Sequence, residues 1–222
     1  INDEQDEKVG DYKSDRKPVV RFAEGQSMTA IWAVKSLGID PINGREVFVK
    51  KDGSLSYTWD TNDQIVAGDS EAKLTGNIGA AMEYMGLSLN LSFTFKYGGQ
   101  TYNSTLLNKI ENVDVASVNV DKRVLYDRWN TPGVAAKYKD ITNRSNTYPT
   151  TRFVEDLDEF VFSAISVGYD FSELNFVKRS PIDRLRLSFN MNDIGRISTV
   201  KQERGTEYPF ARTFSFSLSA SF

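Results

Sequence analysis

The last twelve residues, A-R-T-F-S-F-S-L-S-A-S-F (Ala211–Phe222), alternate between two kinds of side chain. Every second residue from the first phenylalanine onward is apolar, and the residues between them are Ser or Thr. A period of two places successive side chains on opposite faces of a β-strand. The stretch therefore predicts a strand with a hydroxyl face and a large apolar face, which carries Phe214, Phe216, Leu218, Ala220 and Phe222.

The same period recurs in residues 74–84, 87–97, 161–171 and 184–192. These segments are about nine to eleven residues long, which is the length that a tilted membrane-spanning strand needs and longer than most soluble strands. Each has one apolar face and one face rich in Ser, Thr and Asn. In the third segment we expect one face to carry Val161, Ile165, Val167, Tyr169 and Phe171, opposite Phe162, Ala164, Ser166, Gly168 and Asp170.

The remaining segments have weaker patterns. Ile1–Lys17 is charged, and residues 1–26 read as a loop with part of a strand. Residues 27–73 predict a weak strand at Ser27–Leu37 and a hairpin that turns at Asp52–Gly53. The expected organisation is completed by a hairpin at 74–97, a long loop at 98–160 with a short helix at Asn119–Trp129, and three strands within 161–222.

The composition excludes several classes of function. The chain has no cysteine and no histidine, which argues against disulfides, the common zinc sites and Ser–His or Cys–His catalysis. Its 27 basic and 30 acidic residues are nearly balanced, so a nucleic-acid partner is not expected. We therefore expect no enzyme activity, no cofactor and no metal.

Two architectures fit the alternating strands. A soluble β-sandwich alternates in the same way, with its apolar face turned inward. The strand lengths, the small polar faces and the alternation of short and long connections instead favour part of a large antiparallel transmembrane β-barrel with long extracellular loops. A strip of five strands would leave two unpaired edges in lipid, so we expect further strands upstream of Ile1.

Several long runs resemble the C-terminal part of the SusC/RagA-like TonB-linked outer-membrane transporters of Bacteroidetes. They are S-L-G-I-D-P-I-N-G-R-E-V-F-V-K-K-D-G (Ser36–Gly53), Y-G-G-Q-T-Y-N-S-T-L (Tyr97–Leu106), V-D-K-R-V-L-Y-D-R-W-N-T-P-G (Val120–Gly133), R-L-R-L-S-F-N-M-N-D (Arg184–Asp193) and the segment Lys201–Phe222. The resemblance implies a 22-stranded barrel in the bacterial outer membrane that imports oligosaccharides or peptides.

The resemblance also implies partners. These are a SusD-like surface lipoprotein that acts as a lid, TonB acting through an N-terminal part and a plug that this chain lacks, the remaining barrel, the barrel-assembly machinery and outer-membrane lipid. The aromatic end at Phe222 resembles the signal that the assembly machinery reads, and Phe214, Phe216 and Leu218 would face lipid. The alternatives are a non-transporting outer-membrane barrel and a soluble β-sandwich that binds or adheres.

Aromatic and amide side chains on the long loop are candidates for contact with substrate or lid. They are Tyr102, Asn103, Trp129, Tyr138 and Tyr148. Aromatic faces could stack on sugar rings or peptide side chains. The alternative interpretation, which we favour for these residues, is that they pack the loop or face the lipoprotein.

Two groups of charged residues have alternative interpretations. The acidic residues Glu155, Asp156, Asp158 and Glu159 suggest calcium, but they lack the spacing of a calcium loop and fit a solvated rim better. Arg184 and Arg186 share the polar face of their strand, where pairing with carboxylates is expected.

Overall fold

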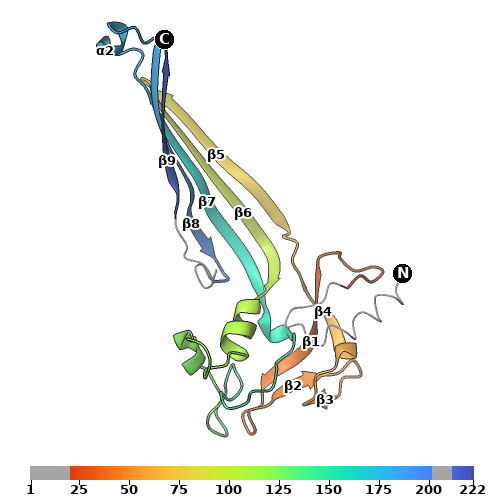
Figure 1. The fold of residues 1–222 in the computed structure, drawn as a ribbon. Coiled ribbons are helices and arrows are strands. Elements are labelled where there is room, and N and C mark those ends of the chain that lie inside the picture. Colours follow the sequence, from red (N-terminus) through yellow and green to blue (C-terminus); the bar gives the residue numbers. More distant parts are fainter. Residues whose placement is uncertain (1–20, 202–211) are drawn as a thin grey trace. The chain divides into compact units, whose positions relative to one another are not determined.

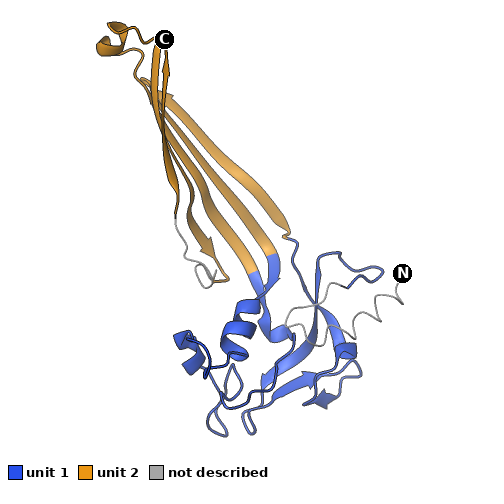
Figure 2. Cartoon of the chain, viewed as in Figure 1, with its two compact units in different colours: residues 1–71, 99–156 blue, residues 72–98, 157–222 orange. Residues whose placement is uncertain are grey.

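The structure of the chain is a computed structural model, and it describes residues 21–201 and 212–222. The charged stretch Ile1–Lys17 and the loop with Arg204, Gly205 and Pro209 lie outside the described residues. The chain forms two compact units (Figure 2). Unit 1 comprises Ile1–Glu71 and Gly99–Asp156, and unit 2 comprises Ala72–Gly98 and Leu157–Phe222. Within residues 21–201 and 212–222, no helix is long and apolar enough to cross a membrane.

Unit 1 contains a four-stranded sheet with the order β3-β2-β1-β4 (Figure 1). The central strand β1 (Ala30–Ile39) pairs antiparallel with β2 (Glu46–Val49) and with β4 (Gln64–Asp69). The short β3 (Leu55–Ser56) pairs with β2.

The sequence reading of this sheet is only partly right. β1 is buried at four consecutive residues, Ile31–Val34, so both of its faces are covered and no alternation marks it. The hairpin around Asp52–Gly53 is present, but β3 has two residues and only Gly53 takes a positive φ. β4 was not predicted, because its sequence, Q-I-V-A-G-D, has adjacent apolar residues and no alternation.

The long segment between β6 and β7 folds into short helical turns rather than strands. They are a π-helical turn η3 (Leu106–Glu111) and the 3₁₀ helices η4 (Lys122–Leu125) and η5 (Thr151–Phe153), to which η2 (Thr61–Asp63) adds a fourth in unit 1. The turns η3, η4 and η5 each insert one or two apolar side chains into a common core, whereas η2 has no buried residue. The fully buried members are Val34, Leu107, Ile110, Val124 and Phe153.

The predicted helix Asn119–Trp129 is wrong in extent, because only η4 is helical. Asp121 caps this turn by accepting a hydrogen bond from the Arg123 amide. Val124 is its one buried residue, so no apolar face continues along the segment. The next residue, Tyr126, is extended, with a φ of −104° and a ψ of 156°, which ends the turn.

Unit 2 is built on one antiparallel sheet with the order β5-β6-β7-β8-β9, whose strands lie side by side in Figure 1. The strands are β5 (Leu74–Tyr84), β6 (Leu87–Tyr102), β7 (Val154–Asp170), β8 (Arg184–Ser198) and β9 (Phe214–Ser221). A four-residue helix α2 (Asn175–Lys178) lies between β7 and β8. Each of the five alternating segments therefore forms a strand, and β6, β7 and β8 extend beyond the segments that alternate.

The register keeps the apolar side chains on one face. Leu187, Phe189 and Met191 of β8 lie opposite Leu218, Phe216 and Phe214 of β9, while Ser188 lies opposite Ser217 on the other face. In the β5–β6 hairpin, Ile78 pairs with Phe93 in the same way. Because directly paired residues share a face, unit 2 has one apolar and one polar face.

The expected faces of β7 need one correction. The register between β7 and β8 shifts between Phe162 and Ala164, where Asp193 of β8 has a φ of 52°. Phe162 stacks on Phe93, with ring centroids 4.6 Å apart, so Phe162 lies on the apolar face. Val161 is therefore not on the face of Ile165 and Val167, because an irregularity of one residue exchanges the two faces of a strand.

Candidate functional site

A cluster of charged side chains lies in unit 1, where Arg152 joins two carboxylates from distant parts of the chain. Its Nε and Nη2 atoms donate to the two carboxylate oxygens of Glu46, at 2.8 Å each. Nη2 also donates to Oε1 of Glu111 at 2.8 Å. Burial lowers the pKa of Arg152, but the two carboxylates outweigh burial and hold this pKa above its usual value. The ion pairs are almost fully removed from water, with the Glu111 side chain 0% exposed.

Lys139 extends the cluster. Its ammonium group is buried and donates to the carbonyl of Ser145, to Asn112 Oδ1 at 3.2 Å and to Thr147 Oγ1 at 3.1 Å. Thr147 in turn donates to Glu111 at 3.4 Å. Burial lowers the pKa of Lys139, and the nearby Glu111 opposes this shift. The network therefore fixes the loop around Thr147 against η3.

A cavity of about 360 Å³ borders this cluster. Trp59 and Tyr148 stack in its wall, with ring centroids 4.8 Å apart and the Trp59 indole donating to the Pro149 carbonyl at 3.1 Å. Aromatic faces beside polar groups suit the binding of a ligand that is partly apolar and partly polar. The other lining residues include Arg45, Phe48, Tyr57, Glu111, Lys139 and Asn143.

Tyr148 is the predicted contact residue that lines this cavity. Tyr102 is mostly buried instead, with its ring edge-on to Phe153 and its hydroxyl without a hydrogen-bond partner among the described residues. Asn103 joins the end of β6 to the start of β7, because its side-chain amide donates to Glu155 at 2.7 Å and its backbone N–H donates to the Phe153 carbonyl. In this structure both residues pack the loop.

Trp129 and Tyr138 lie together on another part of the loop. The Trp129 backbone N–H donates to the Tyr138 carbonyl at 2.9 Å, and the indole N–H donates to the Pro41 carbonyl at 2.8 Å. The Trp129 ring lies directly over Gly44, where an added Cβ would meet ring carbons at 2.6 Å. Trp129 thus anchors the loop to the turn between β1 and β2.

Replacing Gly44 with alanine should displace Trp129. Gly44 has a φ of 69° and lacks room for a Cβ, whereas Gly53 has a φ of 84° and open space around it. Gly53→Ala should cost about 1 kcal/mol through backbone strain alone. Gly44→Ala should cost a further 1–3 kcal/mol, roughly the cost of overpacking. Denaturant unfolding followed by tryptophan fluorescence measures both, and equal costs would show that the ring contact is unimportant.

Removing the Tyr102 hydroxyl should change how the stability of unit 1 depends on pH. Burial raises the pKa of Tyr102 well above its ordinary value of 10.0, and the charge of Glu46 adds to this. The unfolded chain loses this proton near pH 10 while the folded chain keeps it, so unfolding becomes more favourable as the pH rises above 10. Tyr102→Phe should therefore be less sensitive to alkali than the unaltered protein.

Unfolding measured by tryptophan fluorescence at several pH values tests this prediction, since Trp32, Trp59 and Trp129 are the tryptophans of the chain and all lie in unit 1. Lys139, whose lowered pKa favours stability as the pH rises toward 10.5, is common to both proteins and cancels in the comparison. Identical alkaline profiles would contradict the prediction.

Side chains on the polar face of unit 2 form ion pairs and hydrogen bonds between strands. Arg184 pairs with Asp170 at 2.9 Å, as expected for that arginine. Arg186 of β8 instead donates to the hydroxyl of Ser88 at 3.0 Å, which lies on β6, beyond the intervening β7. This face therefore presents ordered arginine and hydroxyl groups.

The acidic residues expected at a rim are spread over both units. Glu155 and Asp156 accept hydrogen bonds from Asn103 and Gln100 in unit 1. In unit 2 Asp158 accepts from the Gly98 backbone, and Glu159 pairs with Arg196 at 2.9 Å. In the part of the chain that the structure describes, no group of three His, Cys, Asp or Glu residues could hold a metal ion.

The ion pairs of Arg152 in unit 1 could not be predicted from the sequence. Arg152 lies 106 residues from Glu46 and 41 residues from Glu111. No local period or motif links such positions. The sequence analysis placed Trp59 in the expected hairpin and gave it no role. An aromatic residue at the end of a hairpin strand, beside a loop, could have been proposed as part of a binding surface.

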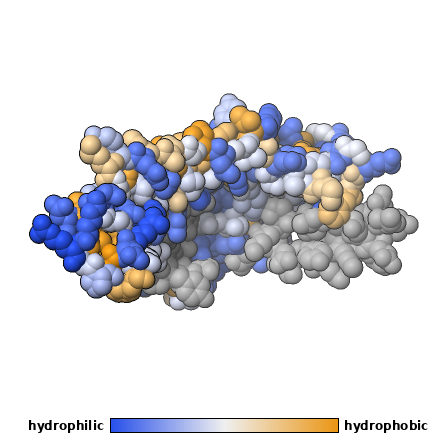
Figure 3. Space-filling model, turned by 90° about the horizontal axis from the view of Figure 1, so that it is seen from above, coloured by the Kyte–Doolittle hydropathy of each residue, from blue (hydrophilic) through white to orange (hydrophobic). Residues whose placement is uncertain are grey.

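The apolar residues of the terminal strand are open to the surface of unit 2. Phe214, Phe216, Leu218 and Phe222 are 63%, 66%, 70% and 81% exposed. Orange patches of hydrophobic residues reach the surface in the view of Figure 3. Such a continuous exposed apolar face indicates contact with another apolar phase or partner.

Comparison with known proteins finds likeness only at the level of the fold. No protein-family model and no curated protein matches the chain. Among solved structures, the chain is similar to the RagAB peptide importer in its "open-open" state, with a TM-score of 0.64, 15% identity and coverage of 78% of this chain and 19% of that chain. A structure of the RagAB peptide transporter gives a TM-score of 0.63, 14% identity and coverage of 77% and 19%.

A third match is the RagAB peptide importer in its "closed-closed" state, with a TM-score of 0.60, 15% identity and coverage of 77% of this chain and 20% of that chain. The chain thus spans about a fifth of the length of the proteins it matches. The fold of this chain is therefore similar to that of part of RagAB.

Proposed function

We propose that this chain forms part of the barrel wall and the extracellular loops of a TonB-dependent importer in the bacterial outer membrane. The observation that carries the proposal is the sheet of unit 2, whose apolar face is exposed and whose other face is polar. The likeness of the fold to part of the RagAB peptide importer supports it.

The exposed apolar face suits lipid. Burying a Phe or Leu side chain is worth about 1.5–3 kcal/mol, so the exposed row on β9 would be costly in water. A β-sandwich would cover such a face with a second sheet, but unit 2, over its described residues, has a single sheet. The outer edges of β5 and β9 would be paired by further strands of the barrel, because unpaired backbone groups are not tolerated in lipid.

In this arrangement the Arg186–Ser88 face lines the lumen and unit 1 lies on the extracellular side. The cavity beside Trp59 and Tyr148 would meet substrate or a lipoprotein lid, while Tyr102, Asn103, Trp129 and Tyr138 shape the loops that carry it. The proposed substrates are peptides or oligosaccharides, and RagAB is a peptide importer. TonB, a plug, the rest of the barrel and the barrel-assembly machinery, through Phe222, complete the proposed partners.

Fractionation of cells that express the intact protein tests the proposal. We expect the protein in the outer membrane, extractable only with detergent and associated with a surface lipoprotein. Deletion of its gene should abolish growth on a peptide or glycan that depends on it, and so should deletion of tonB. Recovery as a monodisperse protein without detergent would refute the membrane assignment. Growth unaffected by either deletion on every substrate tested would favour a non-transporting barrel.

A further inference from the structure

The cavity of unit 1 beside Trp59 and Tyr148 has an aromatic wall. Phe48 and Tyr57 join these two residues in its lining. Because the Trp59 N–H already donates to the Pro149 carbonyl, the Trp59 ring presents apolar surface to the cavity. A volume of about 360 Å³ is near the lower end of the range for ligand pockets. The cavity therefore suits a small part of a larger substrate, with an apolar face against the rings.

Three of the four charged residues in the lining belong to the buried network. Glu46 and Glu111 share Arg152, and the Lys139 ammonium is held by three oxygen acceptors. The positive charges of Arg152 and Lys139 balance those of the two carboxylates. The fourth charged residue of the lining, Arg45, is exposed. The lining and the network behind it therefore carry a net positive charge, which is that of Arg45.

Arg45 is positioned by stacking on Tyr57. Its guanidinium carbon lies 4.8 Å from the ring centroid, and the ring is fixed because its hydroxyl donates to Asp40 Oδ2 at 2.6 Å. Asp40 also accepts from the Ile42 N–H and from Asn43 Nδ2 at 2.8 Å each, so its carboxylate is occupied in its own turn. Arg45 Nη2 makes a long hydrogen bond of 3.4 Å to the Tyr57 carbonyl, and no carboxylate among the described residues forms an ion pair with Arg45. Its remaining N–H groups can take a carboxylate through two parallel hydrogen bonds.

Asn143 adds neutral donors to the same lining. Its Oδ1 accepts from the Ser145 N–H at 3.0 Å and from the Ser145 hydroxyl at 2.6 Å, which fixes the amide. Its Nδ2 group has no partner in the part of the chain that the structure describes. Arg45 and Asn143 thus supply unfilled donors to a ligand that is rich in acceptors.

We infer that this cavity binds a unit of the imported substrate that carries a carboxylate beside an apolar or ring-shaped face. The inference rests on the proposed function, which brings substrate to unit 1. The carboxylate would take the planar fork of Arg45, and the apolar face would lie on the rings of Trp59 and Tyr148. A uronic-acid residue of an oligosaccharide and the carboxylate of a peptide both offer this chemistry.

A cationic ligand does not fit these charges. It would first meet the positive charge of Arg45. Glu46 is paired with Arg152, and the Glu111 side chain is 0% exposed, although its Oε2 atom has no hydrogen-bond partner among the described residues. A cation could reach that oxygen only by opening the buried network.

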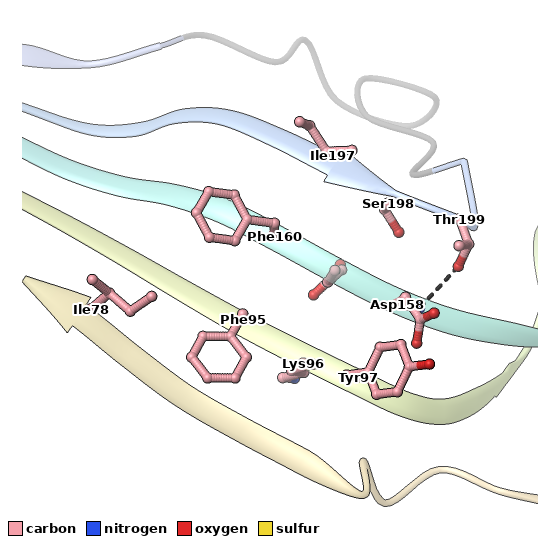
Figure 4. A pocket seen from close by; sticks show the side chains of 10 residues that line it. Ile78, Phe95, Lys96, Tyr97, Asp158, Phe160, Ile197, Ser198 and Thr199 are labelled. Atoms are coloured by element: carbon pink, nitrogen blue, oxygen red, sulfur yellow. Dashed lines mark hydrogen bonds between the residues drawn. The ribbon is translucent and has the colours of Figure 1, made fainter.

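A hollow of about 570 Å³ on unit 2 is a poorer candidate for an acidic ligand. Figure 4 shows Phe95 of β6 and Phe160 of β7 in its lining, with Ile78 on the neighbouring β5. The proposed function already turns the apolar face of this sheet toward lipid. A water-soluble acidic substrate gains nothing there, because burying a charge among hydrocarbon is costly.

Titration calorimetry with two matched pairs of ligands tests the inference on the intact protein in detergent. The first pair is trigalacturonate and its methyl ester. The second pair is N-acetyl-trileucine and its C-terminal amide. Within each pair the rings or side chains stay the same and the negative charge is removed. Binding is measured at low and at high salt.

We expect the acidic member of one pair to bind about fivefold more tightly than its neutral partner, as for an ion pair with an exposed cation. The preference should shrink at high salt, because exposed charges are screened. It should disappear in Arg45→Gln, which keeps donors but removes the charge, and persist in part in Arg45→Lys. The pair that shows the preference identifies the substrate as an oligosaccharide or a peptide.

Two further variants separate the parts of the site. Lys50→Gln removes an exposed charge of unit 1 outside the cavity lining, so it should leave the preference unchanged. Trp59→Leu should weaken both members of the pair by about fivefold and keep the preference, because ring contact is lost while Arg45 remains. Hydrogen–deuterium exchange checks that each variant keeps the fold of unit 1.

The outcomes keep the inference apart from the proposed function. Equal affinities within both pairs, a preference that survives in Arg45→Gln, or no measurable binding of any of these ligands would overturn the carboxylate site and leave the membrane assignment intact. A preference for the acidic ligand, together with growth that is unaffected by deletion of the gene or of tonB, would support the site and refute import.

Discussion

Phe216→Asp should sharply reduce the amount of assembled protein, whereas Ser217→Asp should be tolerated. Phe216 is 66% exposed on the apolar face, 5.1 Å from Phe189 between ring centroids. If this face meets lipid, the substitution loses the burial of the ring and places a carboxylate in hydrocarbon. Together these effects should cost about 2–4 kcal/mol. This is a large share of the stability of a typical domain.

Ser217 provides the matched control because it is the next residue on the same strand. It pairs with Ser188 on the polar face, where a carboxylate would stay hydrated. We expect a change within about 0.5 kcal/mol, as for most surface substitutions. The folded fraction in outer membranes, read from heat-dependent electrophoretic mobility, measures both. A greater loss of folded protein for Ser217→Asp would show that the two faces are assigned the wrong way round. Equal losses for the two variants would show that the faces do not differ in their environment.

The sheet of unit 2 was predictable because its pattern is local. Each strand carries apolar side chains on one face and polar side chains on the other, so adjacent residues such as Phe216 and Ser217 show the period of two. The prediction of the two faces failed at one place in this sheet, in β7. The irregularity at Phe162–Ala164 changes the face of β7 without any glycine or proline there, so Val161 was assigned to the wrong face.

Unit 1 was largely unpredictable for the opposite reason. β1 is covered on both faces at Ile31–Val34, which removes alternation, and its partners β2 and β4 are short. The remaining core is made by single residues from separate turns, such as Val124 and Phe153. Pairings such as Glu46 with Arg152 span 106 residues and leave no local signal. Only Tyr148, one of five candidate residues, was found in the wall of the unit 1 cavity.

Arg152→Met should unfold the loops of unit 1 while leaving the sheet of unit 2 intact. The substitution keeps a long apolar stem but leaves Glu46 and Glu111 buried without their cation, with side chains only 8% and 0% exposed. Breaking a buried ion pair from one side costs about 3–5 kcal/mol. Hydrogen–deuterium exchange should rise in β2, η3 and η5, because each contributes to or adjoins the Arg152 cluster.

The matched control is Lys137→Met, which breaks an exposed ion pair in the same unit. Lys137 lies 3.7 Å from Asp127, with side chains 77% and 58% exposed. Exposed pairs contribute about 0–1 kcal/mol, so exchange should hardly change. The double variant Arg152→Met with Glu111→Gln should recover part of the lost protection, since one of the two stranded charges is removed. If Arg152→Met left exchange in β2 and η3 unchanged, the cluster would be a consequence of the fold rather than one of its supports.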